Sequence, residues 1–201
     1  LGPEQHGHLA TVGYDMYCKL MEETLREVQG QPMAMQELAT RVDLKVDAFL
    51  PGDYVHDERQ RMEMYKRIAS LRTDIEREDI EEEMIDRFGD LPAPVVNLLD
   101  IAQLRALAQG LGGGQVIYRA KGQLVMRLDQ RYIPDPQLLT QAMMDTDKRL
   151  SLTPTQPVSL MLRDPKLGEG DMLLEGVKVL KQLSARLDQR KKQKEKAKPK
   201  A

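Results

Sequence analysis

The sequence of 201 residues contains no Trp, two Phe and one Cys, and its hydrophobic stretches are short. Aromatic residues make up 4% and charged residues 31%, which is typical of a helix-rich protein with a core of Leu, Met, Ile and Val. The single cysteine, Cys18, excludes an internal disulfide and fits a reducing compartment. No stretch approaches the ~20 apolar residues of a membrane span, and the amino end lacks a basic region followed by an apolar one. We therefore expect no membrane contact, no secretory signal and a cytoplasmic location.

The formal net charge of −2 is divided unevenly along the chain. Residues 190–201 contain seven Lys or Arg and one Glu, whereas the remaining residues contain 23 basic and 31 acidic side chains. Affinity for duplex DNA depends on neutralising phosphates, so the acidic body is a poor candidate for binding it. We interpret residues 190–201 as a basic, disordered, solvated tail. Weak contact of this tail with nucleic acid is the alternative.

Apolar residues at helical spacing predict a helix-rich module over residues 11–111, preceded by a loop at residues 1–10. Thr73 and Glu76 form a capping-box pattern, in which the two side chains satisfy free amides at the start of a helix. Short connections between consecutive helices favour antiparallel neighbours. The expected helices of this module are 11–29, 57–71, 73–88 and 94–109.

The helical module also contains one segment with the period of a strand. Apolar residues alternate with polar ones from Val42 to Ala48, and Pro51 and Gly52 follow as a turn. We therefore predict a strand near residues 41–50.

The character of the sequence changes at the three glycines of residues 112–114, which we interpret as a flexible joint between modules. The following residues, 115–189, combine short apolar stretches with turn residues and predict a small α+β module. Its expected elements are strands 115–119, 123–128, 149–153 and 158–163, a short helix 136–144 and a long C-terminal helix 170–187. The predicted fold class of the whole chain is α+β.

Motifs for catalysis, cofactor binding or metal binding are not found in this sequence. A nucleotide hydrolase needs a phosphate loop of the G-x-x-x-x-G-K-[ST] type, and the three glycines at 112–114 follow a helix rather than open one. His6 and His8 are two residues apart in an expected loop, His56 is distant and the single cysteine lies in an expected helix, which does not match the paired spacing of a zinc site. We therefore predict no catalytic, metal-binding or cofactor-binding residue in this segment.

An acidic cluster is the most distinctive feature of the sequence. Eight carboxylates lie between residues 74 and 88, against two arginines. On a helix that turns about 100° per residue, four of them share one side within roughly 80°. These four are Glu76, Asp79, Glu83 and Asp86. The apolar residues of the helix, Ile80, Met84, Ile85 and Phe88, are expected to face the core.

Two interpretations of this cluster remain open from the residues alone. Composition favours a solvated face that gives solubility. A docking surface for a basic partner is the alternative, and the placement of Glu83 and Asp86 supports it. Both lie near the carboxyl end of the helix, where the helix dipole disfavours negative charge.

Several segments resemble the bacterial transcription-repair coupling factor family. The first eight residues are similar to the end of a translocation motif shared with the RecG helicase, in which L-G-x-x-Q-S-G is usual; His6 stands where Ser is expected. The order and spacing of the other matching segments follow the family through residue 110. They are Val12–Tyr17, Val46–Pro51, Arg61–Arg72, Asp86–Pro92 and Asn97–Asp100.

The resemblance implies a non-catalytic regulatory role for this segment. Family members use ATP to move along DNA behind stalled RNA polymerase and to recruit the excision-repair protein UvrA. ATP and Mg²⁺ would belong to the parent motor, and Gln5 would be a remnant of its translocation motif. The family's C-terminal domain is understood to pack on a UvrB-like module of the same chain and to hide the UvrA-binding surface until polymerase is engaged. Under this resemblance the docking interpretation is favoured, with Glu76, Asp79, Glu83 and Asp86 facing the UvrB-like module and Glu83 and Asp86 as its main contacts.

Overall fold

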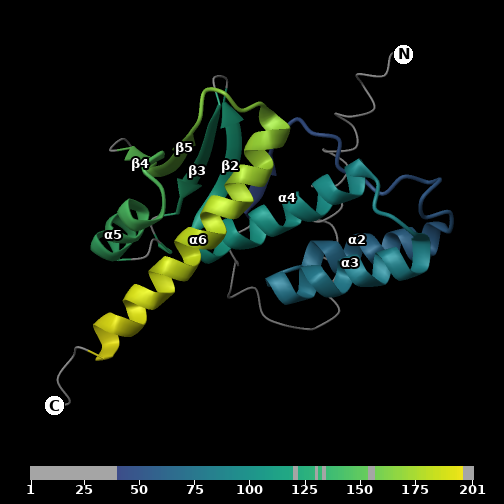
Figure 1. Ribbon diagram of the computed structural model, residues 1–201, viewed down its shortest axis with the longest axis horizontal. Coiled ribbons are helices and arrows are strands. Elements are labelled where there is room, and N and C mark those ends of the chain that lie inside the picture. Colours follow the sequence, from purple (N-terminus) through teal and green to yellow (C-terminus); the bar gives the residue numbers. More distant parts are fainter. Residues whose placement is uncertain (1–39, 120–121, 130, 133–134, 154–156, 197–201) are drawn as a thin grey trace. The chain divides into compact units, whose positions relative to one another are not determined.

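The computed structural model describes residues 40–119, 122–129, 131–132, 135–153 and 157–196, which form an α+β fold with a long C-terminal helix, as predicted (Figure 1). The chain divides into two compact units. Among the described residues, the first unit contains residues 45–106, and the second combines residues 40–44 with those from 107 to 196. The predicted helix at 11–29 and the residues Gln5, His6 and His8 lie outside the described residues.

The first unit is built from α2 (Glu58–Ser70), α3 (Asp74–Phe88) and most of α4 (Ala93–Gly110). All three helices were predicted within a few residues. Asp57 starts α2 by accepting a hydrogen bond from the Gln60 amide, a usual N-cap arrangement. Each helix contributes apolar side chains that are almost completely buried. They include Met64, Ile68, Ile80, Met84, Val95, Leu98, Leu99 and Leu104.

The predicted strand at 41–50 is wrong in its length, because only β1 (Arg41–Asp43) forms. Beyond it the chain runs alongside the first unit's helices, where backbone groups find other partners. The Asn97 side chain donates to the Asp47 carbonyl at 2.9 Å, and the Phe49 amide donates to the Pro94 carbonyl at 3.3 Å. Ala48 and Leu50 are buried there. Beyond β1, the alternation of apolar and polar residues therefore reflects the burial of an extended segment against helices. It does not indicate a longer strand.

The second unit contains a five-stranded sheet in the order β1-β2-β3-β5-β4. Its other strands are β2 (Gly113–Arg119), β3 (Gln123–Leu128), β4 (Leu150–Thr153) and β5 (Ser159–Arg163). β1 is parallel to β2, and the remaining pairs are antiparallel. β1 therefore belongs with the second unit, although it precedes the first unit's helices in the chain.

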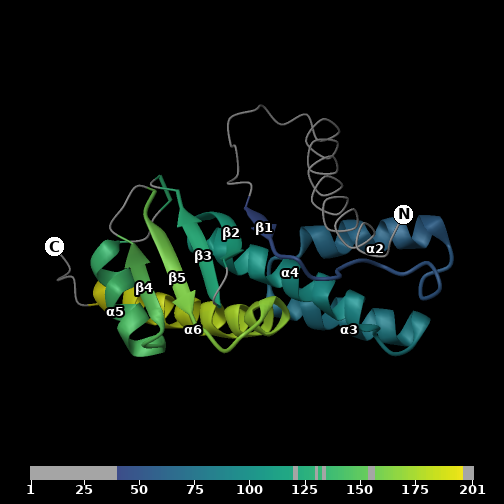
Figure 2. The same cartoon turned by 90° about the horizontal axis from the view of Figure 1, so that it is seen from above.

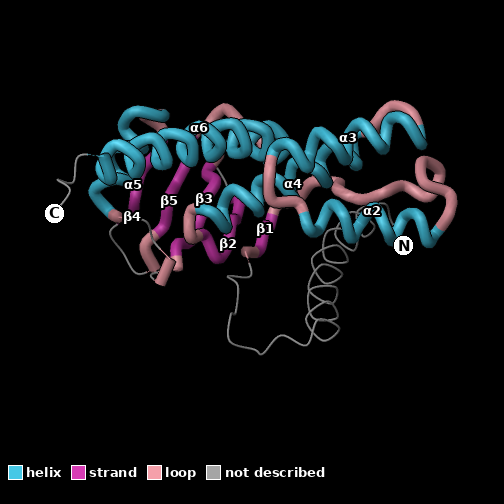
Figure 3. Tube along the Cα trace, turned by 90° about the horizontal axis from the view of Figure 1, so that it is seen from below, coloured by secondary structure: helices cyan, strands magenta, loops and turns pink. Residues whose placement is uncertain are grey.

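Two helices cover one side of this sheet (Figure 3). α6 (Glu169–Lys196) packs on β3, and α5 (Pro136–Thr146) lies against α6. The sheet residues on this side form rows across the strands, and one row is Val42, Val116, Met126 and Leu160, each 3% exposed or less. From α6, Met172, Leu173, Leu180 and Leu183 complete the core.

Two further expectations for this unit need correction. The glycines at 112–114 are not a flexible joint, because Gly113 and Gly114 lie in β2, where the Gly113 carbonyl accepts a hydrogen bond from Thr40 Oγ1 at 2.6 Å. The predicted tail is helical as far as Lys196. Arg190 binds Asp145 and Lys194 binds Asp135, so α5 holds this extra part of α6 in place.

Candidate functional site: the acidic side of α3

The start of α3 is fixed by the capping box that the sequence predicted. Thr73 Oγ1 accepts from the Glu76 amide at 3.2 Å, and the Glu76 carboxylate accepts from the Thr73 amide at 3.1 Å. The same carboxylate accepts from the Arg72 amide at 2.6 Å. Glu76 is therefore committed to the helix start.

The end of α3 is held by an aromatic cluster. Gly89 has φ of +87°, a backbone conformation that favours glycine, and its amide donates to the Ile85 carbonyl at 3.0 Å. Tyr54 donates from its hydroxyl to the Gly89 carbonyl at 2.9 Å, and its ring meets that of Phe88 edge-on at 5.8 Å. The guanidinium of Arg87 lies 4.9 Å from the centre of the Phe88 ring.

Glu83 connects α3 to α2. Its carboxylate accepts from Arg67 of α2 and from Arg87, the latter at 2.6 Å, and its side chain is 28% exposed. Two arginines thus compensate the negative charge that the helix dipole would oppose near this end. This pairing explains how the chain tolerates a carboxylate at that position.

On the opposite edge, Arg77 connects α3 to α4. Its guanidinium contacts Glu81 at 2.8 Å and Asp100 at 2.7 Å and donates to Gln103, which in turn donates to Asp74 at 2.5 Å. Asp100 is 2% exposed, and burial raises the pKa of its carboxyl despite the adjacent arginine. With Arg67 on one edge and Arg77 on the other, α3 is anchored on both flanks.

The outward side of α3 carries six exposed residues within about 120° of one another. We call these residues the acidic face: Ile75, Glu78, Asp79, Glu82, Ile85 and Asp86. Asp79 and Asp86 were predicted as site residues and do belong to it, and neither forms an ion pair with a described residue. Glu83 and Glu76 lie at its border, each with partners of its own.

The isoleucines of the acidic face were not expected there. Ile75 is 70% exposed and Ile85 is 48% exposed, so the prediction that Ile85 faces the core is wrong. The core is already supplied by Ile80 and Met84. The spacing 75, 78, 82 and 85 could have revealed this, because such residues stack along one side of a helix.

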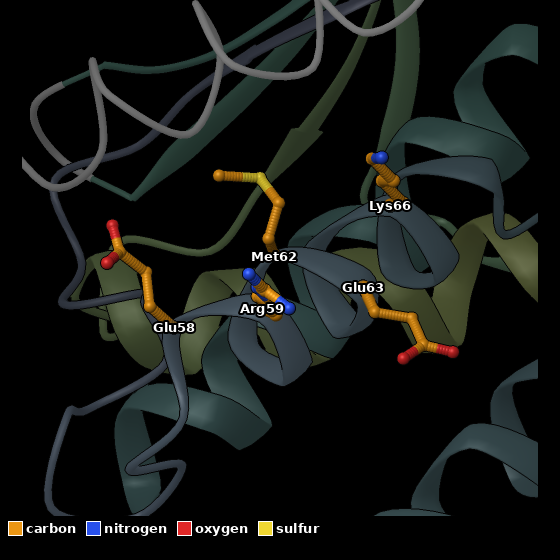
Figure 4. A pocket seen from close by; sticks show the side chains of 5 residues that line it. All are labelled: Glu58, Arg59, Met62, Glu63 and Lys66. Carbon is orange, nitrogen blue, oxygen red and sulfur yellow. The ribbon is translucent and has the colours of Figure 1, made fainter.

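Hollows lie on the surface of the first unit. Figure 4 shows one along α2, lined by Glu58, Arg59, Met62, Glu63 and Lys66. Its lining contains no serine, threonine, cysteine or histidine. The described residues also include no group of three or more side chains placed to hold a metal ion, and no described helix combines the length and apolar character needed to cross a bilayer.

Comparison with known proteins identifies the family. Residues 44–139 match the family described as TRCF domain. The chain contains a TRCF domain. It is similar to the transcription-repair-coupling factor of Escherichia coli (strain K12), with 38% identity over 137 residues, or 66% of this chain and 12% of that protein. The corresponding protein of Staphylococcus aureus (strain USA300) is 33% identical over 164 residues, or 81% of this chain and 13% of that protein.

A solved structure shares the fold of this TRCF-domain chain. The C-terminal domain of a transcription-repair coupling factor aligns with a TM-score of 0.65 and 22% identity, covering 76% of this chain and 95% of that one. The family resemblance predicted from the sequence is therefore confirmed. The matching part of the chain spans only 9–13% of the length of the transcription-repair-coupling factors of Bacillus subtilis (strain 168), Escherichia coli and Staphylococcus aureus.

Proposed function

We propose that this chain is the non-catalytic, autoinhibitory domain of a transcription-repair coupling factor. The acidic face of α3 would dock on the UvrB-like module of the parent chain and cover its UvrA-binding surface until RNA polymerase is engaged. ATP hydrolysis, with Mg²⁺ and the coupling role of Gln5, would belong to the parent motor in the cytoplasm. The observation that carries this proposal is the acidic face itself, where exposed carboxylates and isoleucines lie on a helix anchored at both edges.

The arrangement suits a contact that can be released. Exposed ion pairs contribute only about 0–1 kcal/mol each, so a few of them give a weak interaction. Ile75 and Ile85 add apolar area that a partner would remove from water. A contact worth a few kcal/mol holds the closed state in the majority, yet polymerase binding elsewhere on the parent can shift the population.

The geometry ranks the four carboxylates predicted for docking. Asp86 and Asp79 are exposed and available to a partner's cations. A cation approaching Glu83 would compete with Arg67 and Arg87, and Glu76 would have to leave the helix cap. We therefore assign the main contacts to Asp86 and Asp79, with Glu83 as a secondary contact and Glu76 at the border.

Calorimetric titration of this chain into the isolated UvrB-like module of its parent tests the proposal. The test variant is Asp79→Lys/Asp86→Lys, and the matched control is Glu58→Lys/Glu63→Lys, the same charge change on exposed positions of α2. We expect the test variant to abolish wild-type binding and the control to retain it, with both folded by circular dichroism. In the full parent, the test variant should bind UvrA more tightly than wild type. Absence of binding in the titration, together with unchanged UvrA affinity in the parent, would reject autoinhibition.

The predicted alternative, a nucleic-acid-binding accessory module that uses the basic end of the chain, receives less support. Within the described part of α6, Arg190, Lys191 and Lys194 are paired with Asp145, Asp188 and Asp135. These pairs reduce the cationic charge available for phosphates. A steep decrease of DNA affinity with salt, lost when Lys191, Lys192 and Lys194 become Gln, would favour this alternative.

A further inference from the structure

Figure 2 shows the sheet of the second unit with α5 and α6 on one of its sides. The strand register places apolar residues and arginines on the other side. Strand register places Ile117, Val125 and Met161 in one row across β2, β3 and β5. The next row on this side of the sheet lies two residues further along the strands. It contains Arg119 on β2 and Arg163 on β5, with Gln123 of β3 between them. Arg127 lies in the row on the other side, opposite Gln115. The rows on both sides of the apolar row thus contain arginines, while Asp43 on β1 and Ser151 on β4 continue the apolar row at its two ends. We call Arg119, Arg127 and Arg163 the arginine face.

The register also gives the dimensions of the arginine face. Neighbouring strands lie about 4.8 Å apart, so the backbones of Arg119 and Arg163 are separated by roughly 10 Å. Arg127 lies about four residues along the strands from that pair, or roughly 13 Å. A segment of a few turns of helix, or a short extended peptide, covers such an area.

All three arginines are exposed, Ile117 and Met161 are half-buried, and Val125 between them is 5% exposed, so Ile117 and Met161 supply the accessible apolar area of the row. Arg127 donates to Gln115 at 2.8 Å, and Arg119 and Arg163 form no ion pair with a described residue. Asp43 and Arg41 at the β1 edge share this side of the sheet. The acidic residues nearest to Arg163 and Arg127 in the sequence form ion pairs elsewhere: Asp164 with Arg149, and Asp129 with Arg131.

The net charge of the long segment that contains this sheet side, residues 107–196, is also positive. Residues 107–196 contain sixteen Lys or Arg and ten Asp or Glu, a net of +6, of which residues 190–196 at the end of α6 supply +4. The positive charge of this side of the sheet therefore comes mainly from the three arginines. Charge complementarity therefore calls for an acidic occupant on the arginine face. Arginine suits this role because its planar guanidinium binds carboxylates through two parallel hydrogen bonds.

We propose that the arginine face binds an acidic protein segment whose carboxylates flank apolar side chains. The half-buried Ile117 and Met161 would receive the apolar residues, and the arginines would receive the carboxylates. Single-stranded nucleic acid fits less well, because such sites stack bases on aromatic rings. The one aromatic residue in the described strands, Tyr118, aligns with the buried Leu124 on the helix-covered side.

Fluorescence anisotropy with two probes tests this proposal on the intact chain. The first probe is a labelled peptide with the sequence of residues 73–90, which combines carboxylates with isoleucines, and the second is a short labelled single-stranded DNA. A control peptide replaces every Glu and Asp by Gln and Asn. The test variants are Arg119→Gln/Arg163→Gln and Met161→Ser, and the matched charge control is Arg186→Gln/Lys192→Gln on exposed positions of α6.

We expect saturable binding of the acidic peptide, weakened about tenfold by the arginine pair, weakened also by Met161→Ser, and unchanged in the α6 control. The control peptide should not bind. Equal loss of affinity in the α6 control would mean non-specific attraction and would overturn the proposal, as would absence of peptide binding. DNA binding that the arginine pair abolishes, without peptide binding, would reassign the face to nucleic acid. Self-association that the arginine pair abolishes, detected by sedimentation, would reassign it to a second copy.

Discussion

Arg77 of α3 and Asp100 of α4 form an ion pair with 2.7 Å between Nη1 and Oδ1. Asp100 is almost completely buried, and its Oδ2 has no hydrogen-bond partner among the described residues. Arg77 is the cation that compensates this buried charge, and it also contacts Glu81 on its own helix. The side of α3 that is turned away from solvent is thus joined to α4, which leaves the acidic face fixed in orientation.

Replacing Asp100 by Ala should destabilise the first unit. Removing one member of a buried ion pair leaves the other without its partner, and we expect the free energy of unfolding to fall by about 3 kcal/mol. Urea denaturation followed by circular dichroism measures this change. Asp79→Ala, on the exposed side of the same helix pair, is the control and should change stability by less than about 0.5 kcal/mol. Similar effects of the two substitutions would contradict the assignment of Arg77–Asp100 as a structural pair.

Arg149 should make the stability of the second unit depend on pH. It contacts Asp147 at 2.7 Å and Asp164 at 2.9 Å and also binds Glu175 of α6. Its hydrogen bonds lower the pKa of Asp147, and the pKa of Asp164 is lowered by the Lys166 amide and by Arg149. A carboxylate whose pKa is depressed by folding contributes stability above its unfolded pKa of 3.8 and loses that contribution as pH falls through the folded value.

Arg149→Met should therefore lower the melting temperature at pH 7, and its difference from wild type should shrink as pH falls below about 4. Thermal denaturation across pH 2–7 measures this difference. Arg186→Met, an exposed position on α6, should follow the wild-type curve at every pH. A difference that stayed constant with pH would show that Arg149 acts through packing of its aliphatic part instead.

Gly122 should not tolerate a side chain. Its φ is +63°, and a Cβ there would overlap the Asp164 carbonyl, which is backbone and cannot rotate away. The Asp164 amide donates to the Gly122 carbonyl at 2.8 Å, so the two segments cannot separate without losing this bond. We expect Gly122→Ala to destabilise the chain by about 3 kcal/mol. Gly168→Ala, where a Cβ meets nothing within 4 Å, is the matched control and should be close to neutral.

Local signals made most of the fold predictable. The Thr73–Glu76 capping box spans four residues, and both of its hydrogen bonds are present. The hairpin of β2 and β3 also follows from adjacent residues, with Gly122 in its turn. Such elements depend on short-range periodicity and turn chemistry, which a single sequence contains.

Non-local partners account for what the sequence could not predict. Arg190 and Lys194, at the end of α6, bind acids 45 and 59 residues earlier, which short-range periodicity does not reveal. The same limit applies to the candidate site. Helical periodicity indicates on which side of α3 Glu83 lies. Its partner Arg67 is on α2, and only the packing of α2 against α3 brings the two side chains together.

The exposed isoleucines give a prediction that separates apolar docking from electrostatic docking. Ile75→Ser/Ile85→Ser should leave stability nearly unchanged, because both side chains are already largely in water, whereas Ile80→Ser should destabilise the fold. If the acidic face docks as proposed, the double variant should bind the UvrB-like module at least about tenfold more weakly. Calorimetry at two salt concentrations then distinguishes the contributions. The loss caused by Asp86→Lys should shrink at high salt, because exposed charges are screened, while the loss caused by the isoleucine variant should persist. An isoleucine variant that binds as tightly as wild type would mean that the partner contacts the carboxylates alone, and the apolar part of the docking surface would have to be abandoned.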